Sequence, residues 1–358
     1  MEEKATALTP TAQATEFATA VSMIRQAHDN VMRMANTALI DLYWNMGKYI
    51  SERTAEAAWG KGVVAQLARY IEENEPNVRG FSAQNLWRMK QFYETYRGNE
   101  KLSTLMREIS WSNNLLIMSK AKSDEEKEFY MRLCVSERLK TRELDRQFAS
   151  CLYERTVLEE PKLSTGLREI APQAASVFRD TYVMEFISGK EAKPENALRK
   201  TMLKKMKQLI LELGKDFIAI DEEYRVQVGT HDYRIDLLFY HRRLQCLVAF
   251  ELKTEEFQPE HLGKLNFYLE ALDRDVRYDN ENPSIGVLLC KSKDDEVVEY
   301  AMSRSLSPTL VAQYELALPD KRMLQQRVHE IYQQSMEEME GQAKTEPSTS
   351  KRQLTNNP

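Results

Sequence analysis

The chain has 358 residues, 42% of them hydrophobic and 29% charged, and a net charge of −5 at pH 7. This length has room for two domains, and the composition is that of an ordinary globular protein. No apolar run approaches the roughly 18 residues of a membrane span, and the polar N-terminus does not resemble a signal peptide. We therefore expect no membrane contact and a cytoplasmic location. The four cysteines are scattered, which predicts neither a zinc site nor a disulfide framework.

The first part of the chain is predicted to be a disordered lead followed by helices. Residues 1–17 are polar and small. After them, apolar residues recur at spacings of three and four, as on the buried face of a helix. Ser82 and Ser123 stand where N-caps belong, directly before two of these patterns. The spacing predicts an all-α domain over 18–155, with helices at 18–56, 63–73, 83–96, 109–118, 124–135 and 142–155.

Residues 63–96 resemble a helix-turn-helix, because Pro76 and Gly80 interrupt two helical patterns. The second helix carries amide and cationic side chains in its first turns. Side chains of these types read adenine, guanine or phosphate. The alternatives are a helical bundle with a solvated polar face and a surface that contacts another protein. The predicted DNA-binding residues of this helix are Gln84, Asn85, Arg88 and Lys90.

A second domain is predicted after a linker at 156–175, which contains proline and glycine residues. Strands and helices alternate over 176–340, which predicts a mixed α/β sheet with helices on its faces. The polar residues 341–358 are expected to form a disordered tail. Helices are predicted at 176–187, 195–213 and 259–271. A further helix is predicted to end at about residue 302, and another to begin at residue 319. The predicted strands lie at 217–220, 224–228, 233–240, 244–252, 285–290 and 310–314.

Three charged residues stand in the two most apolar strands of this domain. Asp236 lies within the strand 233–240, and Glu251 and Lys253 end the strand 244–252 after a short turn. Because side chains alternate along a strand, Glu251 and Lys253 point to the same face, about 7 Å apart. A charge in such surroundings needs a partner or a metal ion. The alternative interpretation is a structural ion pair at a sheet edge.

These residue types suit phosphodiester hydrolysis. Two neighbouring carboxylates attract a hard divalent cation, and Mg²⁺ takes only one or two of them. Such a cation lowers the pKa of a bound water and neutralises charge on a phosphate. A lysine beside it stabilises the oxyanion that forms. Glu-x-Lys alone is a weak signal, since Glu125 and Lys127 have the same spacing outside any apolar strand.

Two further sets of residues are candidates for the site. Residues 188–215 contain eight Lys or Arg against three Glu, a net charge of +5 in an acidic chain. A local basic patch suffices for contacts to a phosphate backbone. Lys204 and Lys205 are the predicted DNA contacts here, with a solvated helix face as the alternative. Lys264 and Tyr268 lie one turn apart on the helix after Lys253 and are predicted to face the site.

Long stretches of the chain resemble one known family. In the second domain they are RIDLLFYHRRLQCLVAFELKTEEFQPEHLGKLNFYLEALD and NPSIGVLLCKSKDDEVVEYAM, and in the first they include YWNMGKYI, FSAQNLWRMKQFY and ISWSNNLLIM. These motifs closely resemble the YhcG-type PDDEXK nuclease family of bacteria. The resemblance implies an α+β two-domain protein, with an all-α helix-turn-helix-like N-terminal domain and an α/β restriction-endonuclease-like C-terminal domain.

The resemblance also implies roles for single residues. Asp236, Glu251 and Lys253 match the catalytic D…E-x-K set, in which the two acids bind Mg²⁺ or, in its place, Mn²⁺. In restriction-like folds a helix before the first strand often brings a further acid to the site, which makes Glu212 a candidate. Many relatives carry Gln at the position of Lys264, so this chain departs from the family there.

We therefore expect a Mg²⁺-dependent DNA endonuclease that uses a metal-activated water and is targeted by its helical domain. The first alternative is a non-cleaving DNA-binding accessory protein of a restriction or defence system, which would leave the charged trio without a role. The second is a protein-binding helical adaptor, which would leave residues 224–253 unexplained. A homodimer would suit cleavage of both strands, and partners from a restriction or defence system are a family-level expectation.

Overall fold

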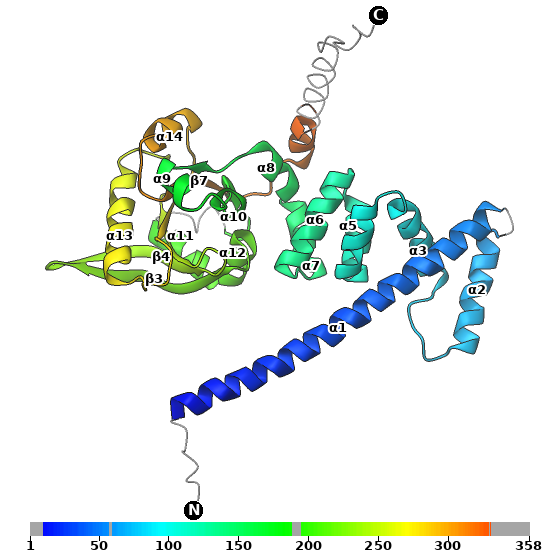
Figure 1. The fold of residues 1–358 in the computed structure, drawn as a ribbon. Coiled ribbons are helices and arrows are strands. Elements are labelled where there is room, and N and C mark those ends of the chain that lie inside the picture. Colours follow the sequence, from blue (N-terminus) through cyan, green and yellow to red (C-terminus); the bar gives the residue numbers. More distant parts are fainter. Residues whose placement is uncertain (1–9, 57–58, 188–194, 329, 331–358) are drawn as a thin grey trace, which may run out of the picture. The chain divides into compact units, whose positions relative to one another are not determined.

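The computed structural model describes residues 10–56, 59–187, 195–328 and 330 (Figure 1). They divide into two compact units, with the boundary between Asp145 and Arg146. None of the helices in these ranges is both long and apolar enough to cross a membrane. Residues 1–9 of the expected disordered lead lie outside the described residues. Residues 10–17 are helical, so the expectation of disorder is wrong for them. The expected tail lies outside the described residues entirely.

The first unit is built from helices, as the apolar spacing predicts. Its core includes Ile50 of α1, Val64 of α2 and Met89 of α3. Gly47 lets α1 and α3 approach closely, since a Cβ there would lie 2.1 Å from the carbonyl oxygen of Met89. The helices are α1 (Pro10–Ala55), α2 (Lys61–Asn74), α3 (Ala83–Tyr96), α4 (Glu100–Leu105), α5 (Trp111–Lys120) and α6 (Asp124–Glu137), and α7 (Thr141–Ala149) runs into the second unit.

The third helix begins where its capping residue predicts. Ser82 Oγ accepts a hydrogen bond from the backbone N–H of Asn85, and the helix ends at Tyr96. The connection from α2 to α3 takes up residues 75–82, close to the break that the sequence predicts. A helix-turn-helix joins its two helices by about three or four residues. These two helices therefore depart from that motif in the length of their connection.

The second unit contains a seven-stranded mixed sheet with strand order β1-β7-β6-β5-β4-β3, and β2 pairs with β7. Strands β3, β4 and β5 are antiparallel neighbours, whereas β5, β6 and β7 run parallel. This arrangement confirms the predicted mixed α/β sheet. The strands are β1 (Lys162–Leu163), β2 (Thr181–Val183), β3 (Phe217–Val228), β4 (His231–His241), β5 (Cys246–Leu252), β6 (Ile285–Cys290) and β7 (Thr309–Glu315).

Helices cover both faces of the sheet (Figure 1). Val287 and Leu289 of β6 pack toward α9, α11 and α12, whereas Leu288 and Cys290 pack toward α13 and α14. This alternation makes β6 apolar on both sides, as expected for a buried parallel strand. The helices of this unit are α8 (Leu152–Leu158), α9 (Thr165–Ile170), α10 (Ala174–Val177), α11 (Glu195–Lys204), α12 (Met206–Leu213), α13 (His261–Asp275) and α14 (Asp295–Met302).

Two expectations about residues 156–187 are wrong. The segment 156–175 is not a free linker, because β1 pairs with β7 and Ser164 caps α9. The helix expected at 176–187 is replaced by the end of α10 and by β2, which pairs with β7 in parallel. All three side chains of β2 are buried. Thr, Tyr and Val suit a strand, and the pairing partner lies more than a hundred residues away, where a local pattern does not reveal it.

Other element boundaries also differ from the expectation. The helix expected at 142–155 is interrupted, because Cys151 adopts a φ of 51° between α7 and α8. The strands expected at 217–220 and 224–228 form the single strand β3, with a register shift between Ala219 and Asp221. The helix expected after residue 319 is present at 321–328, and its continuation lies outside the described residues.

Gly166→Ala is expected to destabilise the second unit by about 1–3 kcal/mol, as overpacking does. A Cβ at this position would lie 1.9 Å from the carbonyl oxygen of Leu306, so α9 would have to move. Chemical unfolding measures the effect. The matched control is Gly263→Ala in α13, where the Cβ meets open space. The control should be neutral or stabilising by up to about 1 kcal/mol, and equal stability of the two variants would contradict the packing described.

Candidate active site

Asp236 and Glu251 are brought together by the neighbouring strands β4 and β5. The register pairs Leu237 with Phe250, so the two acids stand at the next position of the same ladder. Asp236 is 7% exposed and Glu251 is fully buried. Burial raises the pKa of Glu251, and the charge of Asp236 raises it further. The structure therefore places two carboxylates close together where their ionisation is costly without compensating charge.

The two oxygens of Glu251 differ in their partners. Oε1 accepts hydrogen bonds from Nζ of Lys264 at 2.6 Å and from Nζ of Lys253 at 3.1 Å. Oε2 is buried and has no hydrogen-bond partner among the described residues. Because each carboxylate oxygen offers about two lone pairs, Oε1 is saturated and Oε2 is not. Oε2 is therefore the atom of this group best suited to ligate a cation.

Asp236 is held in place but keeps acceptor capacity. Its Oδ2 accepts from the backbone N–H of Leu252 at 2.9 Å, and its Oδ1 accepts from Arg199 Nη1 at 2.8 Å. Arg199 lies on α11, and its Nη2 donates to Glu223 at 2.7 Å. Each oxygen of Asp236 therefore has about one lone pair left. The sequence analysis missed Arg199, since it stands beside Leu198 in an apolar helix pattern and only the fold brings it to Asp236.

Lys253 is positioned at the end of β5. Its backbone N–H donates to the carbonyl oxygen of Leu289 at 2.9 Å, and its ammonium lies 3.6 Å from Glu195 at the start of α11. Burial acts to lower the pKa of Lys253, but the charge of Glu251 and the hydrogen bond to it hold the pKa above its usual value. Lys253 is therefore a cation at neutral pH. Glu195 is a second neighbour that the sequence analysis did not identify.

Lys264 reaches the acidic pair, as predicted, whereas Tyr268 contributes its ring. The hydroxyl of Tyr268 donates to the carbonyl oxygen of Arg234 at 2.6 Å, and Lys264 Nζ lies 5.3 Å from the ring centroid. Burial acts to lower the pKa of Lys264, but its hydrogen bond to Glu251 and the charge of that residue raise the pKa to about 12. Lys264 thus supplies a second fixed positive charge to Glu251.

The acidic pair fits a hard cation that needs few protein ligands. Within the described ranges, no set of three or more His, Cys, Asp or Glu side chains is arranged to hold a metal ion. Mg²⁺ retains several waters and takes as few as one or two carboxylates. Oε2 of Glu251 and the remaining lone pairs of Asp236 meet that need. Their all-oxygen character suits Mg²⁺ or Mn²⁺.

Glu212 is not part of this group, which corrects the expectation of a helix-borne acid there. One of its oxygens accepts from Arg146 at 3.0 Å, and the other contacts Arg155 at 3.2 Å, Arg179 at 3.1 Å and the N–H of Val183 at 2.8 Å. Burial acts to raise the pKa of Glu212, but the three arginine charges outweigh it and hold the pKa below its usual value. Both oxygens of this carboxylate have protein partners, and together they join α12 to α7, α8 and β2, which is a structural role.

The candidate DNA-binding residues of α3 divide into two groups. The side-chain amide of Asn85 donates to the carbonyl oxygen of Gly80 at 2.6 Å and accepts from Trp111 Nε1 at 3.1 Å. Its assignment to base reading is therefore corrected, because both ends of the amide are used within the domain. Lys90 pairs with Glu94 at 2.9 Å. Gln84 and Arg88 are exposed, four residues apart on one helix.

The two lysines predicted on the basic segment also differ. Lys205 stands between α11 and α12, and its Nζ donates to the carbonyl oxygen of Phe186. Its charge therefore serves at least in part to hold the chain before α11. Lys204, the last residue of α11, is exposed. Of the two, Lys204 is the better candidate for a phosphate contact.

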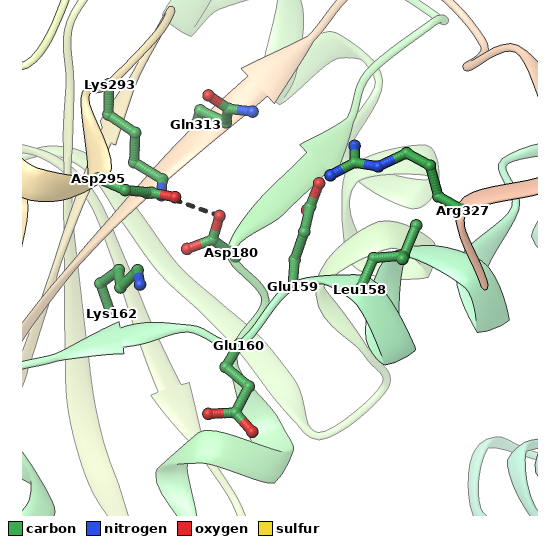
Figure 2. Close-up of a pocket in the computed structure, with 9 residues that line it drawn as sticks. All are labelled: Leu158, Glu159, Glu160, Lys162, Asp180, Lys293, Asp295, Gln313 and Arg327. Atoms are coloured by element: carbon green, nitrogen blue, oxygen red, sulfur yellow. Dashed lines mark hydrogen bonds and ion pairs between the residues drawn. The ribbon is translucent and has the colours of Figure 1, made fainter. Parts of the chain in front are cut away.

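A polar cavity of about 360 Å³ lies elsewhere in the second unit, and Figure 2 shows its lining. The buried Lys293 pairs there with Asp180 at 2.9 Å and with Asp295. Asp180 Oδ1 is buried without a protein partner, and burial raises the pKa of this residue. The cavity shares no residue with the acidic pair of β4 and β5. Its charges of both signs largely balance, so it has neither the composition of a phosphate site nor that of a cation site.

Glu212→Gln is expected to lower the free energy of unfolding of the second unit by about 3–5 kcal/mol, because it leaves buried arginines without their counter-charge. In the parent chain, the depressed pKa predicts stability that is present above the usual glutamate pKa of about 4.3 and is lost as the pH falls. Unfolding measured against pH tests both points, with Glu169→Gln, an exposed residue of α9, as control. Parent-like stability of Glu212→Gln would contradict the structural role.

Comparison with known proteins matches both domains. Residues 175–329 match the model of the YhcG PDDEXK nuclease domain, and residues 19–155 match that of the DUF1016 N-terminal domain. Over 341 residues the chain is 27% identical to "Putative nuclease YhcG" of Escherichia coli (strain K12), which covers 85% of this chain and 90% of that protein.

Two solved structures also match part of the chain. A repair endonuclease from Pyrococcus abyssi matches with a TM-score of 0.25 and 14% identity, over 36% of this chain and 48% of its own. EndoMS in an EndoMS-dsDNA2 complex matches with a TM-score of 0.22 and 19% identity, over 33% of this chain and 46% of its own. The chain thus spans about half the length of each. Residues 19–155 thus belong to the DUF1016 N-terminal domain family, and residues 175–329 belong to the YhcG PDDEXK nuclease domain family.

Proposed function

We propose that the chain is a Mg²⁺-dependent DNA endonuclease that hydrolyses phosphodiester bonds at Asp236, Glu251 and Lys253. The observation that carries this proposal is the buried Oε2 of Glu251, which lacks a protein donor although two lysines saturate Oε1. Buried polar atoms in folded proteins are nearly always satisfied. One buried oxygen also lacks a donor in three other glutamates among the described residues, Glu126, Glu154 and Glu159. What distinguishes Glu251 is the second carboxylate, Asp236, at the facing position of the neighbouring strand, and two adjacent carboxylates suit a cation ligand.

The residues of the site then have distinct tasks. Asp236 and Glu251 hold the cation. A bound Mg²⁺ supplies positive charge at the scissile phosphate and lowers the pKa of a water molecule. Lys253, kept cationic by Glu251, donates a hydrogen bond toward the charge that develops on the phosphate oxygens. Lys264 places a second positive charge beside Glu251 from α13, which counteracts the rise in the pKa of that carboxyl caused by burial.

DNA as the substrate is supported by the family and by exposed polar side chains in both domains. Gln84 and Arg88 of α3 and Lys204 of α11 are exposed and of the types that contact bases or phosphates. We assign the helical domain a targeting role on this basis. Two copies of the chain would supply two sites for the two strands of a duplex.

Lys253→Ala should preserve the fold and reduce DNA cleavage by about 100-fold or more, because a preorganised charge near the reacting phosphate is lost. Asp236→Ala and Glu251→Ala should lose metal binding as well as cleavage. The assay is nicking of plasmid and of branched DNA by the purified chain in Mg²⁺, with circular dichroism to check folding. Removal of the metal by a chelator should abolish the reaction.

The matched control is Lys291→Ala, an exposed lysine directly after β6. It changes the same charge in the same domain and should cleave like the parent. Cleavage by Lys253→Ala at the parent rate would contradict the site. A parent chain that shifts DNA in a binding assay but cuts neither substrate would favour the non-cleaving accessory function.

Arg88→Ala should weaken DNA binding by the full chain several-fold and reduce the magnitude of the slope of log affinity against log salt by about 1, as loss of one phosphate contact does. Arg142→Ala, which removes an exposed arginine from α7, is the control. Fluorescence anisotropy over a salt series measures both. An identical salt slope for the parent and Arg88→Ala would remove α3 from the proposed DNA interface.

A further inference from the structure

The first part of α1 is a helix whose side chains no other described element of the first unit covers. Every side chain from residue 17 to residue 35 is exposed, and Phe17 and Ile24 are 67% and 69% exposed. Within the first unit, burial of the helix begins at Asn36, whose amide donates to the carbonyl oxygens of Arg107 and Ile109, both at 3.1 Å. Helices gain most of their stability in proteins by packing an apolar face. This stretch therefore needs a partner surface.

Seven exposed apolar residues, together with His28, follow an alternating spacing of four and three, and the exposed Met23, Met32 and Met34 lie outside it. Such a spacing is the heptad repeat of a left-handed coiled coil, in which each helix packs along another helix of similar length. It continues through eight positions without a Lys, Arg, Asp or Glu, a length of about 38 Å at 1.5 Å per residue. These positions, the α1 stripe, are Phe17, Val21, Ile24, His28, Val31, Ala35, Ala38 and Leu42.

The α1 stripe is not the face that α1 uses within its own domain. Ile40, Tyr43 and Ile50 are buried and contribute to the core of the first unit. Leu42, at the end of the stripe, is 45% exposed, although the next residue, Tyr43, is buried. The helix therefore packs one face against its own domain and leaves the α1 stripe exposed. Occupation of the stripe would not require the domain to open.

The order of side-chain sizes makes the stripe complementary to itself when the second helix runs in the opposite direction. Its first half carries three large apolar residues and His28, whereas its second half contains two alanines. An antiparallel pair sets large residues against small ones, which fills space evenly, but a parallel pair would stack alanine on alanine and leave gaps. With the residue of the second copy written second, the facing pairs are Phe17–Leu42, Val21–Ala38, Ile24–Ala35 and His28–Val31.

Charge does not oppose this pairing. Residues 17–42 carry two arginines and two aspartates, so two such helices do not repel through net charge. Asp29 pairs with Arg138 at 3.4 Å, and Asp41 pairs with Arg107, both within the first unit. A two-fold symmetric contact of this kind uses the same surface on both copies and closes after two.

We propose that α1 is a dimerisation helix, which pairs antiparallel with α1 of a second copy of this chain along residues 17–42. The occupant is a second copy because the size order of the stripe complements itself. The inference does not rest on the proposed nuclease activity, and oligomeric state and cleavage are measured separately. A monomeric chain that cuts DNA would overturn the dimer alone, and an inactive dimer would leave it intact.

The first test is the mass of the full chain by light scattering over a concentration series. We expect twice the chain mass of 41.7 kDa. The double variant Ile24→Glu with Val31→Glu should be monomeric, because dimerisation would bury its charges along the α1 stripe. Both residues are exposed in the single chain, so the variant should fold like the parent. Thr19→Glu with Gln26→Glu adds the same charge outside the stripe and should remain dimeric. A monomeric parent, or a dimer unaffected by the stripe variant, would overturn the proposal.

The second test fixes the direction of the two helices. All four native cysteines are buried, so introduced thiols dominate mild oxidation. A mixture of Ile24→Cys chains and Ala35→Cys chains should form a disulfide-linked dimer, whereas either variant alone should not. Crosslinking of Ala35→Cys with itself would indicate a parallel pair and overturn the proposed register. Protection of residues 17–35 from hydrogen exchange in a monomeric chain would show that the same chain covers the stripe, which would also overturn the proposal.

Discussion

The burial of Glu251 at the end of β5 is the constraint on which the candidate site depends. A carboxylate in this position costs free energy, and the fold offsets that cost by aiming Lys253 and Lys264 at one of its oxygens. The strand pairing that buries it also sets Asp236 beside it. As a result, two lysines neutralise Glu251 at Oε1, whereas its Oε2 has no donor among the described residues. This Oε2 is the atom that we propose binds a cation.

Glu212 shows why burial alone does not identify a functional acid. Both glutamates are fully buried and both lie close to cations. The pKa of Glu212 is held below its usual value by three arginines, whereas the pKa of Glu251 is raised by burial and by Asp236. Both oxygens of Glu212 have protein donors, whereas Oε2 of Glu251 has none among the described residues. Glu212 therefore joins elements of the fold, and Glu251 has an oxygen available beside a second carboxylate.

The sequence predicts those features that local pattern decides. Ser82 sets the start of α3, and the apolar strands around Asp236 and Glu251 form a ladder because their alternation and the turn at His241 permit one register. Features that need distant partners were missed. β2 is a strand because β7 pairs with it, and the amide of Asn85 is engaged because α5 brings Trp111 to it. Arg199 reaches Asp236 only once α11 packs on the sheet.

The most direct test of the cation site is a crystal of the full chain grown or soaked with Mn²⁺ and measured for anomalous scattering. The account predicts a peak within bonding distance of Glu251 Oε2 and of a carboxylate oxygen of Asp236, with Lys253 and Lys264 still on Oε1. The peak should vanish in Glu251→Gln, with circular dichroism to check that this variant folds. The cation site at Glu251 and Asp236 would be contradicted if the chain bound Mn²⁺ elsewhere. It would also be contradicted if Glu251 Oε2 accepted a hydrogen bond from the protein at full Mn²⁺ occupancy.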